Sequence, residues 1–216
     1  MLYKTGTLFC VWVAIVALSA NLCACGGGGS GGGAPPVFSG AFCDTKAFTP
    51  AAQSPYVLPY PSGVTYTMFQ GNCSPPPGGH QTTFAYDFDH AMGDPITAAR
   101  AGRVTFTAND FPDDGNPANA GGNSVWVLHS DGTVAAYFHM NQGSVMVAVN
   151  QDVLPGDILG LAGNSGASSG PHLHFQVFET NTSFNNDDAV PITFNNATGR
   201  FGTNGELLEG EAYTAN

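Results

Sequence analysis

The sequence predicts an all-β fold, mainly antiparallel, built from short strands and long loops. The 216 residues include 29 Gly and 15 Pro but only 10% charged residues, a composition that favours turns and short strands over long charged helices. No long segment repeats its apolar residues with a helical period, and Gly or Pro turns separate many short apolar segments. With 43% hydrophobic residues, the chain is large enough to bury one sizeable core.

The first 25 residues are typical of an export signal. Lys4 precedes an apolar run from Leu8 to Leu18, which is too short to span a bilayer and has the length of a signal-peptide core. The following LCAC resembles a bacterial lipobox in which Cys25 becomes acylated. We therefore expect residues 1–25 to be a lipoprotein signal peptide, Cys25 to anchor the protein in the membrane, and the protein to lie in the outer membrane facing the periplasm. Ordinary cleavage after Ala20 is the alternative.

A Gly-rich linker and a short extension precede the main fold. Residues 26–38 contain GGGGSGGG and have no core-forming content, so we expect a flexible tether. Residues 39–79 alternate short apolar pieces with Pro and Gly and are expected to pack on the core. Cys43 and Cys73 are the two cysteines outside the signal region, and an even pair in an exported protein predicts a disulfide. Two buried free thiols are the alternative.

The central part of the chain predicts antiparallel strands in order. Residues 95–107 predict two strands around a Gly turn, and residues 124–140 predict a hairpin whose turn is Ser-Asp-Gly. Between them, residues 109–122 are dense in Pro, Gly and Asp and predict a surface loop. A further strand is expected over residues 173–179. Residues 181–216 are polar with two short apolar segments, which indicates edge structure rather than a second domain.

The charge balance limits the partners of the protein. Five Lys and Arg stand against sixteen Asp and Glu, which gives a net charge of −11. A chain this acidic is poorly suited to binding the phosphate backbone of nucleic acids, so we expect no nucleic-acid partner. We expect a monomer.

The six histidines carry the strongest functional signal. His172 and His174 are two residues apart in an apolar segment, and on a strand such residues share one face. His139 ends the predicted hairpin, and His80 lies in a turn shortly before Asp87. Two imidazoles and one carboxylate are typical of an open zinc site with a fourth position for water.

Zinc in such a site lowers the pKa of bound water to about 7 and polarises a substrate carbonyl. The sequence has no HExxH motif and so lacks the glutamate base of that class. An uncoordinated imidazole beside the metal can accept the proton of the water or donate a hydrogen bond to an oxyanion.

Five segments carry a resemblance to a known family. They are, in order, HQTTFAYDF, GDPITAARAGRV, HSDGTVAAYFHM, PGDILGLAGNSG and SGPHLHFQV. Together they resemble the M23 family of zinc metallopeptidases, the lysostaphin-type or LytM-domain cell-wall endopeptidases. The resemblance implies a groove built on two antiparallel sheets, a peptidase core over residues 80–180, one zinc ion per chain, and hydrolysis of peptide bonds in peptidoglycan.

The resemblance also implies a role for each functional residue. The second histidine of HLH, His174, matches a zinc ligand of the family, Asp87 matches its ligating aspartate, and His80 would be the third ligand. His172, the first histidine of HLH, and His139 match the two unligated catalytic histidines.

One departure from the family pattern concerns the first ligand. The commoner pattern places it four residues before the aspartate, where this chain has Thr83, whereas His80 lies seven residues before Asp87. We interpret this as an extended turn between the ligands. Asp89 or His90 as the ligand, or a damaged site, are the alternatives.

Two histidines, His90 and His129, are assigned no role in the proposed site, and two other functions compete with that of an enzyme. His129 is expected at the surface or in the hairpin turn, and His90 is expected to face solvent, with a supporting contact to the site as the alternative. A non-catalytic LytM-like module that binds the cell wall or activates an amidase is the alternative to the enzyme. A structural zinc site in a binding protein is a third hypothesis, although structural sites usually have four protein ligands. The sequence leaves open which peptide bond is cut and whether the substrate is peptidoglycan or protein.

Overall fold

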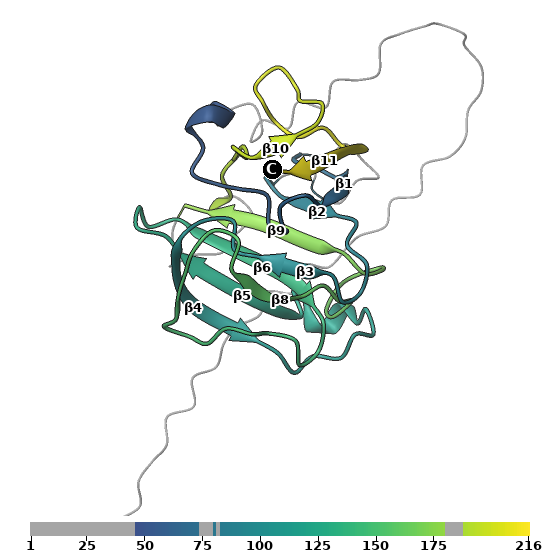
Figure 1. The fold of residues 1–216 in the computed structure, drawn as a ribbon. Helices are drawn as coiled ribbons and strands as arrows, with labels where there is room; N and C mark the ends of the chain where they lie inside the picture. Colours follow the sequence, from purple (N-terminus) through teal and green to yellow (C-terminus); the bar gives the residue numbers. More distant parts are fainter. Residues whose placement is uncertain (1–45, 74–79, 81–82, 180–187) are drawn as a thin grey trace, which may run out of the picture. The chain divides into compact units, whose positions relative to one another are not determined.

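The computed structural model describes residues 46–73, 80, 83–179 and 188–216 (Figure 1). The predicted signal peptide and the Gly-rich linker lie outside these residues. Cys73 is disulfide-bonded, as the cysteine count predicts, and its predicted partner Cys43 also lies outside them. Among the described residues, no helix has both the length and the apolar character needed to cross a membrane.

The described chain consists of short strands with two single-turn 3-10 helices. The helices are η1 (Ala51–Gln53) and η2 (Pro117–Asn119). The strands are β1 (Thr65–Gln70), β2 (Tyr86–Phe88), β3 (Pro95–Thr97), β4 (Gly102–Ala108), β5 (Asn123–Leu128), β6 (Val134–Met140), β7 (Asp152–Val153), β8 (Ile158–Leu161), β9 (Leu173–Phe178), β10 (Ala197–Thr198) and β11 (Glu211–Ala215).

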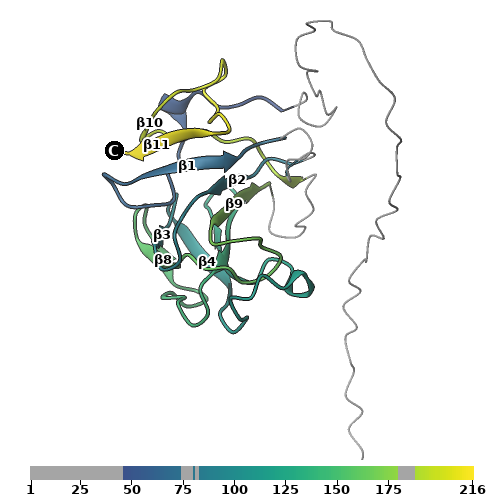
Figure 2. The same ribbon diagram turned by 90° about the vertical axis from the view of Figure 1, so that its right-hand side faces the viewer.

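The strands form two sheets, and every strand pair is antiparallel. The larger sheet has nine strands in the order β10-β11-β1-β2-β9-β6-β5-β4-β7, and the smaller sheet pairs β3 with β8. Figure 2 shows β11, β1, β2 and β9 side by side in the larger sheet. The predicted all-β, mainly antiparallel class is therefore confirmed, and the predicted hairpin corresponds to β5 and β6.

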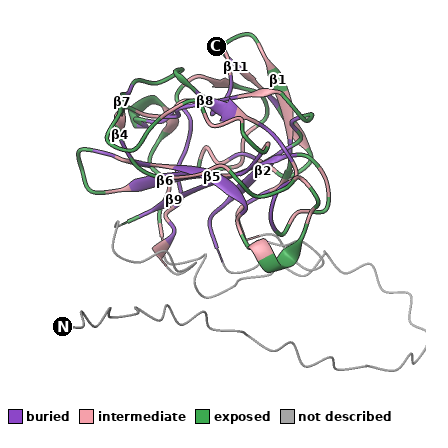
Figure 3. Cartoon of the chain, turned by 90° about the horizontal axis from the view of Figure 1, so that it is seen from below, coloured by how far each residue is buried: buried purple, intermediate pink, exposed green. Residues whose placement is uncertain are grey.

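One face of the larger sheet builds the hydrophobic core. Side chains on a strand alternate between its two faces, so every second residue of the central strands points into this core. The fully buried aromatic rings there include Tyr86, Phe88, Tyr137 and Phe175. Figure 3 shows that the described parts of β5 and β6 are mostly buried, while exposed residues gather in the surrounding loops.

The small sheet closes part of this core. Ile96 of β3 and Leu159 of β8 are fully buried in the same hydrophobic cluster as Tyr137. The hydroxyl group of Tyr137 accepts a hydrogen bond from the backbone N–H of Ala99 at 2.8 Å, just after β3. The predicted strands of residues 95–107 thus exist but do not pair with each other, because β3 pairs with β8 while β4 pairs with β5 and β7.

The opposite face of the larger sheet holds the polar residues that matter for function. Asp87 of β2 and His174 of β9 are direct cross-strand partners, and Phe138 of β6 lies opposite His174. Because directly opposite residues point to the same face, these side chains share one surface. This surface is the open face of the sheet.

Candidate metal centre and active site

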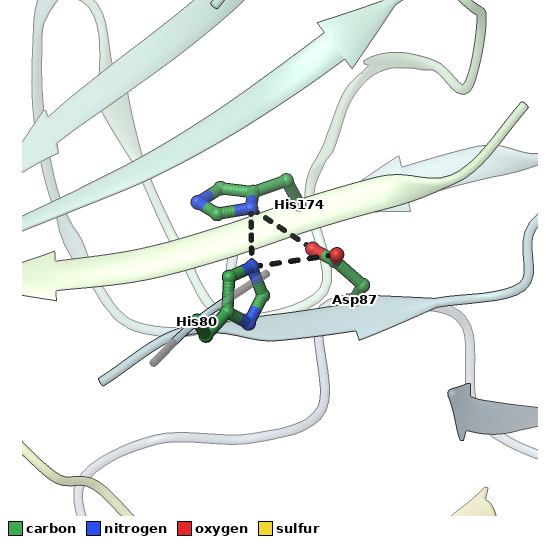
Figure 4. Close-up of side chains that lie close together, drawn as sticks. All are labelled: His80, Asp87 and His174. Atoms are coloured by element: carbon green, nitrogen blue, oxygen red, sulfur yellow. Dashed lines mark hydrogen bonds and ion pairs between the residues drawn. The ribbon is translucent and has the colours of Figure 1, made fainter. Parts of the chain in front are cut away.

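The three predicted ligands meet on the open face (Figure 4). The Nε2 atom of His80 lies 3.2 Å from Nδ1 of His174 and 3.4 Å from Oδ2 of Asp87. The Nδ1 atom of His174 lies 2.9 Å from Oδ1 of Asp87. Ligand atoms about 2.0–2.1 Å from a tetrahedral zinc ion lie about 3.3 Å from one another, so these spacings suit three corners around one ion.

Two neighbouring strands and the segment before them position the ligands. Asp87 and His174 face each other across the β2–β9 ladder, so backbone hydrogen bonds fix their separation. His80 reaches the same point from the chain before β2, and its side chain is only 7% exposed. The longer spacing between His80 and Asp87 therefore does not keep the first imidazole out of the cluster.

Hydrogen bonds on the far side of each ligating imidazole select its tautomer. Nδ1 of His80 lies 3.2 Å from the carbonyl oxygen of Gly71, so it carries the proton and leaves Nε2 free. Nε2 of His174 lies 3.4 Å from Oε1 of Gln176, which leaves Nδ1 free. The amide nitrogen of Gln176 donates to the hydroxyl group of Thr83 at 2.7 Å, which fixes the orientation of the amide. Both free nitrogens point into the cluster.

The two histidines expected to be catalytic lie beside the ligands. The ring centroids of His139 and His172 are 4.7 Å apart, and Nε2 of His172 lies 3.9 Å from Oδ1 of Asp87. Nδ1 of His139 donates to the carbonyl oxygen of Ser165 at 2.7 Å, and Nδ1 of His172 donates to that of Gly170 at 2.9 Å. Each ring therefore keeps an unprotonated Nε2.

His139 has an unusual backbone conformation for a residue in a strand. Its φ angle is +59°, which is in the left-handed region that residues other than glycine seldom occupy. Such a conformation persists only where surrounding contacts impose it, and it is found most often at functional sites. The backbone N–H of His139 donates to Gly121, and its carbonyl oxygen accepts from Gly163, so both sides of the peptide are fixed.

Burial and charge set the protonation of the cluster. Burial lowers the pKa of His80 and of His139 to about 4, so both imidazoles are neutral at pH 7. Burial opposes ionisation of Asp87, but the surrounding imidazoles, His174 first, hold the pKa of its carboxyl group below the usual value. Burial also disfavours the charged form of His174, yet the Asp87 carboxylate raises the pKa of this imidazole. Asp87 is thus the anionic member of the cluster, and its carboxylate favours a positive charge beside it.

The donor set fits a divalent cation. Oδ1 of Asp87 is fully buried and accepts no well-oriented hydrogen bond, although Nδ1 of His174 is close to it. A buried carboxylate oxygen of this kind calls for a cation. Two nitrogens and one carboxylate oxygen are the ligand types that zinc takes in catalytic sites. Among the residues that the structure describes, no other group of His, Cys, Asp or Glu side chains could hold a metal ion.

An open cavity of about 760 Å³ surrounds the cluster. All five residues singled out by the sequence line it, namely His80, Asp87, His139, His172 and His174. Phe69 borders the cavity beside His172, and its ring lies edge-on to that imidazole at 5.6 Å. Trp126 and Phe138 line the cavity as well.

The two other histidines are both buried, so the expected solvent exposure of His90 is wrong, whereas His129 lies at the hairpin turn as expected. His90 is 1% exposed and stacks on the ring of Tyr66 at 3.8 Å. His129 is 3% exposed: it does lie at the hairpin turn, but its ring packs edge-on against Tyr56 at 5.6 Å. Neither His90 nor Asp89 joins the ligand cluster, and Asp89 instead accepts the backbone N–H of Thr67.

Several supporting residues escaped the sequence analysis. The hydroxyl group of Ser168 lies 3.2 Å from Nδ1 of His172 and donates to the carbonyl oxygen of Gly170, which is also the acceptor of the imidazole. Gln176 had a signal in the sequence, since it follows His174 by two residues and must share its face of the strand. No sequence signal indicated the backbone carbonyl groups that accept hydrogen bonds from the other histidines of the site.

Comparison with known proteins identifies the family of one domain of the chain. Residues 81–186 match the model of Peptidase family M23. The chain is 30% identical over 146 residues to a glycyl-glycine endopeptidase, ALE-1, of Staphylococcus capitis, covering 68% of this chain and 34% of that protein. It is 32% identical over 91 residues to the peptidoglycan DD-endopeptidase ShyA of Vibrio cholerae, covering 42% and 19%.

The chain spans about a third or less of the length of these curated relatives. A solved structure, the catalytic domain of lysostaphin from Staphylococcus simulans, is 26% identical with a TM-score of 0.44, covering 58% of this chain and 86% of that one. The domain at residues 81–186 therefore belongs to Peptidase family M23.

Proposed function

We propose that this protein is a secreted zinc metalloendopeptidase that hydrolyses peptide bonds of peptidoglycan. One observation carries the proposal: His80, Asp87 and His174 form a buried three-ligand cluster, and two further imidazoles with free Nε2 atoms lie beside it in an open cavity. Structural zinc sites usually have four protein ligands, whereas three ligands and an open side are typical of catalytic sites. Membership of Peptidase family M23 and the similarity to peptidoglycan endopeptidases support the substrate class.

The residues of the chain divide the work of peptide hydrolysis. His80, Asp87 and His174 would hold the zinc ion, which supplies Lewis acidity toward the scissile carbonyl group and the attacking water. His139 and His172 lie where a free Nε2 atom can accept a proton from that water, and the protonated Nε2 can then donate a hydrogen bond to the oxyanion. The C–N bond breaks as the proton passes to the leaving amine, and the hydroxyl group stays on the carbonyl carbon.

Burial supports this division of roles. The lowered pKa of His139 keeps its imidazole neutral at pH 7 and therefore able to accept a proton. The Asp87 carboxylate is positioned to hold the ion, and its charge offsets one of the two positive charges of zinc. His172 and His174 are two residues apart at the start of β9, so their side chains lie on the same face of the chain. One ligand, His174, and one catalytic group, His172, therefore reach the same cavity.

Paired substitutions test the proposal. His172→Ala should bind one equivalent of zinc and release no peptides from purified peptidoglycan, because the ligands remain. His174→Ala should lose both zinc and activity. The measurements are metal analysis of the purified proteins and chromatography of the released peptides, with wild type and the remote Phe111→Leu variant as controls. Stoichiometric zinc without digestion by the wild type would point to the non-catalytic cell-wall module instead.

The location of the protein is a separate part of the proposal. We infer that Cys25 carries a lipid anchor and that the protein faces the periplasm from the outer membrane, on the strength of the LCAC segment after the short apolar run. The zinc-binding domain would then meet peptidoglycan at the end of its Gly-rich tether. A labelled fatty acid should enter the wild-type protein and not the Cys25→Ser variant.

A further inference from the structure

A run of aromatic rings leads away from the ligand cluster across the open face of the sheet. The ring of Phe138 on β6 lies 5.4 Å from that of His174 on β9. The ring of Trp126 on β5 lies 6.3 Å from Phe138, and that of Phe106 on β4 lies 4.8 Å from Trp126. Each step crosses to the next strand of the sheet, so the run extends at right angles to the strands. We call Phe106, Trp126 and Phe138 the aromatic run.

The aromatic run is accessible and continuous with the active site. Phe106 is 42% exposed, and Trp126 and Phe138 are partly exposed. Trp126 and Phe138 line the same cavity as Asp87 and His174. A molecule held at the ligand cluster can therefore extend over Phe138 and Trp126 within the cavity and reach Phe106, which lies next to Trp126 beyond the cavity lining.

The described residues around Trp126 and Phe138 offer no charged side chain to a ligand. Beside Trp126 and Phe138, this half of the cavity is lined by Ala120, Gly121 and Phe178, and none of these described residues is charged. Gly121 approaches the ring of Phe138 so closely that a Cβ atom there would lie 2.6 Å from Cδ1. The run thus offers uncharged aromatic faces and edges next to a site with a buried carboxylate. Exposed apolar surface of this kind is typical of a binding site.

We propose that the aromatic run is a subsite for the glycan part of the substrate, stacking on the C–H faces of its N-acetylated sugars. This inference rests on the proposed function. Peptidoglycan peptides consist mainly of small and charged residues, which gain little from three aromatic rings. The sugar rings of peptidoglycan have flat, uncharged C–H faces, and these faces pack on aromatic side chains. The protein would therefore recognise peptides that are still joined to sugar.

Fluorescence offers a test of binding that needs no catalysis. The chain has two tryptophans, and Trp12 lies in the expected signal peptide, so Trp126 is the sole tryptophan of the mature protein. The probe is peptide-free glycan oligosaccharide, prepared by removing the stem peptides from purified peptidoglycan with an amidase. We expect a saturable change of tryptophan fluorescence, and we expect Phe106→Leu to weaken the apparent affinity at least fivefold. The matched control is Phe111→Leu, an aromatic residue that is 38% exposed and does not line the cavity.

Hydrolysis provides the second measurement. Cross-linked peptide dimers that carry disaccharides are compared with the same dimers after the sugars have been removed. In the wild-type protein, kcat/KM should be at least tenfold higher for the sugar-bearing dimers. Phe106→Leu should reduce this preference and leave kcat/KM for the sugar-free dimers within twofold, because Phe106 does not line the active-site cavity. Thermal unfolding of each variant identifies any that fails to fold, and Phe106→Leu changes a side chain that is already 42% exposed.

The outcomes separate the two proposals. No fluorescence response to the oligosaccharides, together with equal kcat/KM for both dimers, would overturn the glycan subsite while leaving the peptidase intact. The glycan subsite would also be overturned if the tryptophan fluorescence changed with sugar-free peptides that carry large apolar side chains and not with the oligosaccharides. Saturable sugar binding by a protein that hydrolyses neither dimer would support the subsite and refute the proposed activity.

Discussion

Acid should destabilise the fold through His129, a residue remote from the ligand cluster. Burial lowers the pKa of this imidazole to about 4, against 6.5 in an unfolded chain. Nδ1 donates to the carbonyl oxygen of Ala101 at 2.9 Å, and Nε2 is buried with no hydrogen-bond partner among the described residues. The nearby positive charge of Arg100 further disfavours protonation, whereas Asp131 favours it.

The sign and size of the effect follow from proton linkage. Between pH 6.5 and pH 4 the unfolded chain binds a proton at this position and the folded chain does not, so stability falls as the pH falls. One pKa unit corresponds to about 1.4 kcal/mol, which gives a loss of about 3 kcal/mol at pH 4 relative to pH 7. Above pH 7 this contribution is fully present and no longer changes.

His129→Asn isolates this contribution. An asparagine amide can replace the Nδ1 donor toward Ala101 and cannot titrate. Urea unfolding of metal-free wild type and variant is measured from pH 4 to pH 8 in the presence of a chelator, and the free energy of unfolding is obtained by linear extrapolation. We expect the variant to lose about 3 kcal/mol less than the wild type over this interval, whatever its stability at pH 7. Parallel pH profiles for the two proteins would refute the assignment of a buried, neutral His129.

Three further substitutions should each have a separate effect. Gln176→Leu removes the acceptor for Nε2 of His174 and should lower zinc affinity by about 10–100-fold, measured by competition with a chelator. Ser168→Ala should reduce kcat about tenfold with zinc stoichiometry unchanged, because its hydroxyl group contacts His172 and the acceptor of that imidazole. Tyr137→Phe leaves a buried backbone N–H without its acceptor and should lower the free energy of unfolding by about 1–3 kcal/mol, measured in urea.

Each of these substitutions has a control. Ser169→Ala changes the exposed neighbour of Ser168 and should leave kcat within twofold, so equal losses in both serine variants would contradict a positioning role. Gln176→Glu keeps an acceptor for the imidazole and should retain more zinc than Gln176→Leu. For Tyr137→Phe, unchanged zinc binding together with the loss of stability would show that the hydroxyl group serves the core rather than the site.

The sequence predicted the parts of the fold that depend on local pattern. Alternation and turn residues located β5, β6 and β9 within a few residues. Strand order was beyond reach, because β1 and β11 pair across at least 142 intervening residues, as between Met68 and Glu211, and nothing local specifies that partner. The burial of His90 and of His129 was missed for a similar reason. Their burial depends on Tyr66 and Tyr56, which lie far away in the sequence.

The site shows the same division between local and distant information. The spacing of His172 and His174 and the family resemblance were sufficient to select five residues that the structure brings into one cavity. The left-handed backbone of His139 and the carbonyl groups that orient the imidazoles could not be predicted, since they arise from contacts with Gly121, Gly163 and Ser165 made only in the folded chain.

The division of the larger sheet into a core face and an open face has a practical consequence. Along β9, Phe175 and Val177 maintain the fold, while the intervening His174 and Gln176 serve chemistry. Odd and even positions of one strand are thus under different demands. A mutant library confined to the outward positions of the central strands could redirect specificity while most variants still fold, and one confined to the inward positions would mainly sample stability.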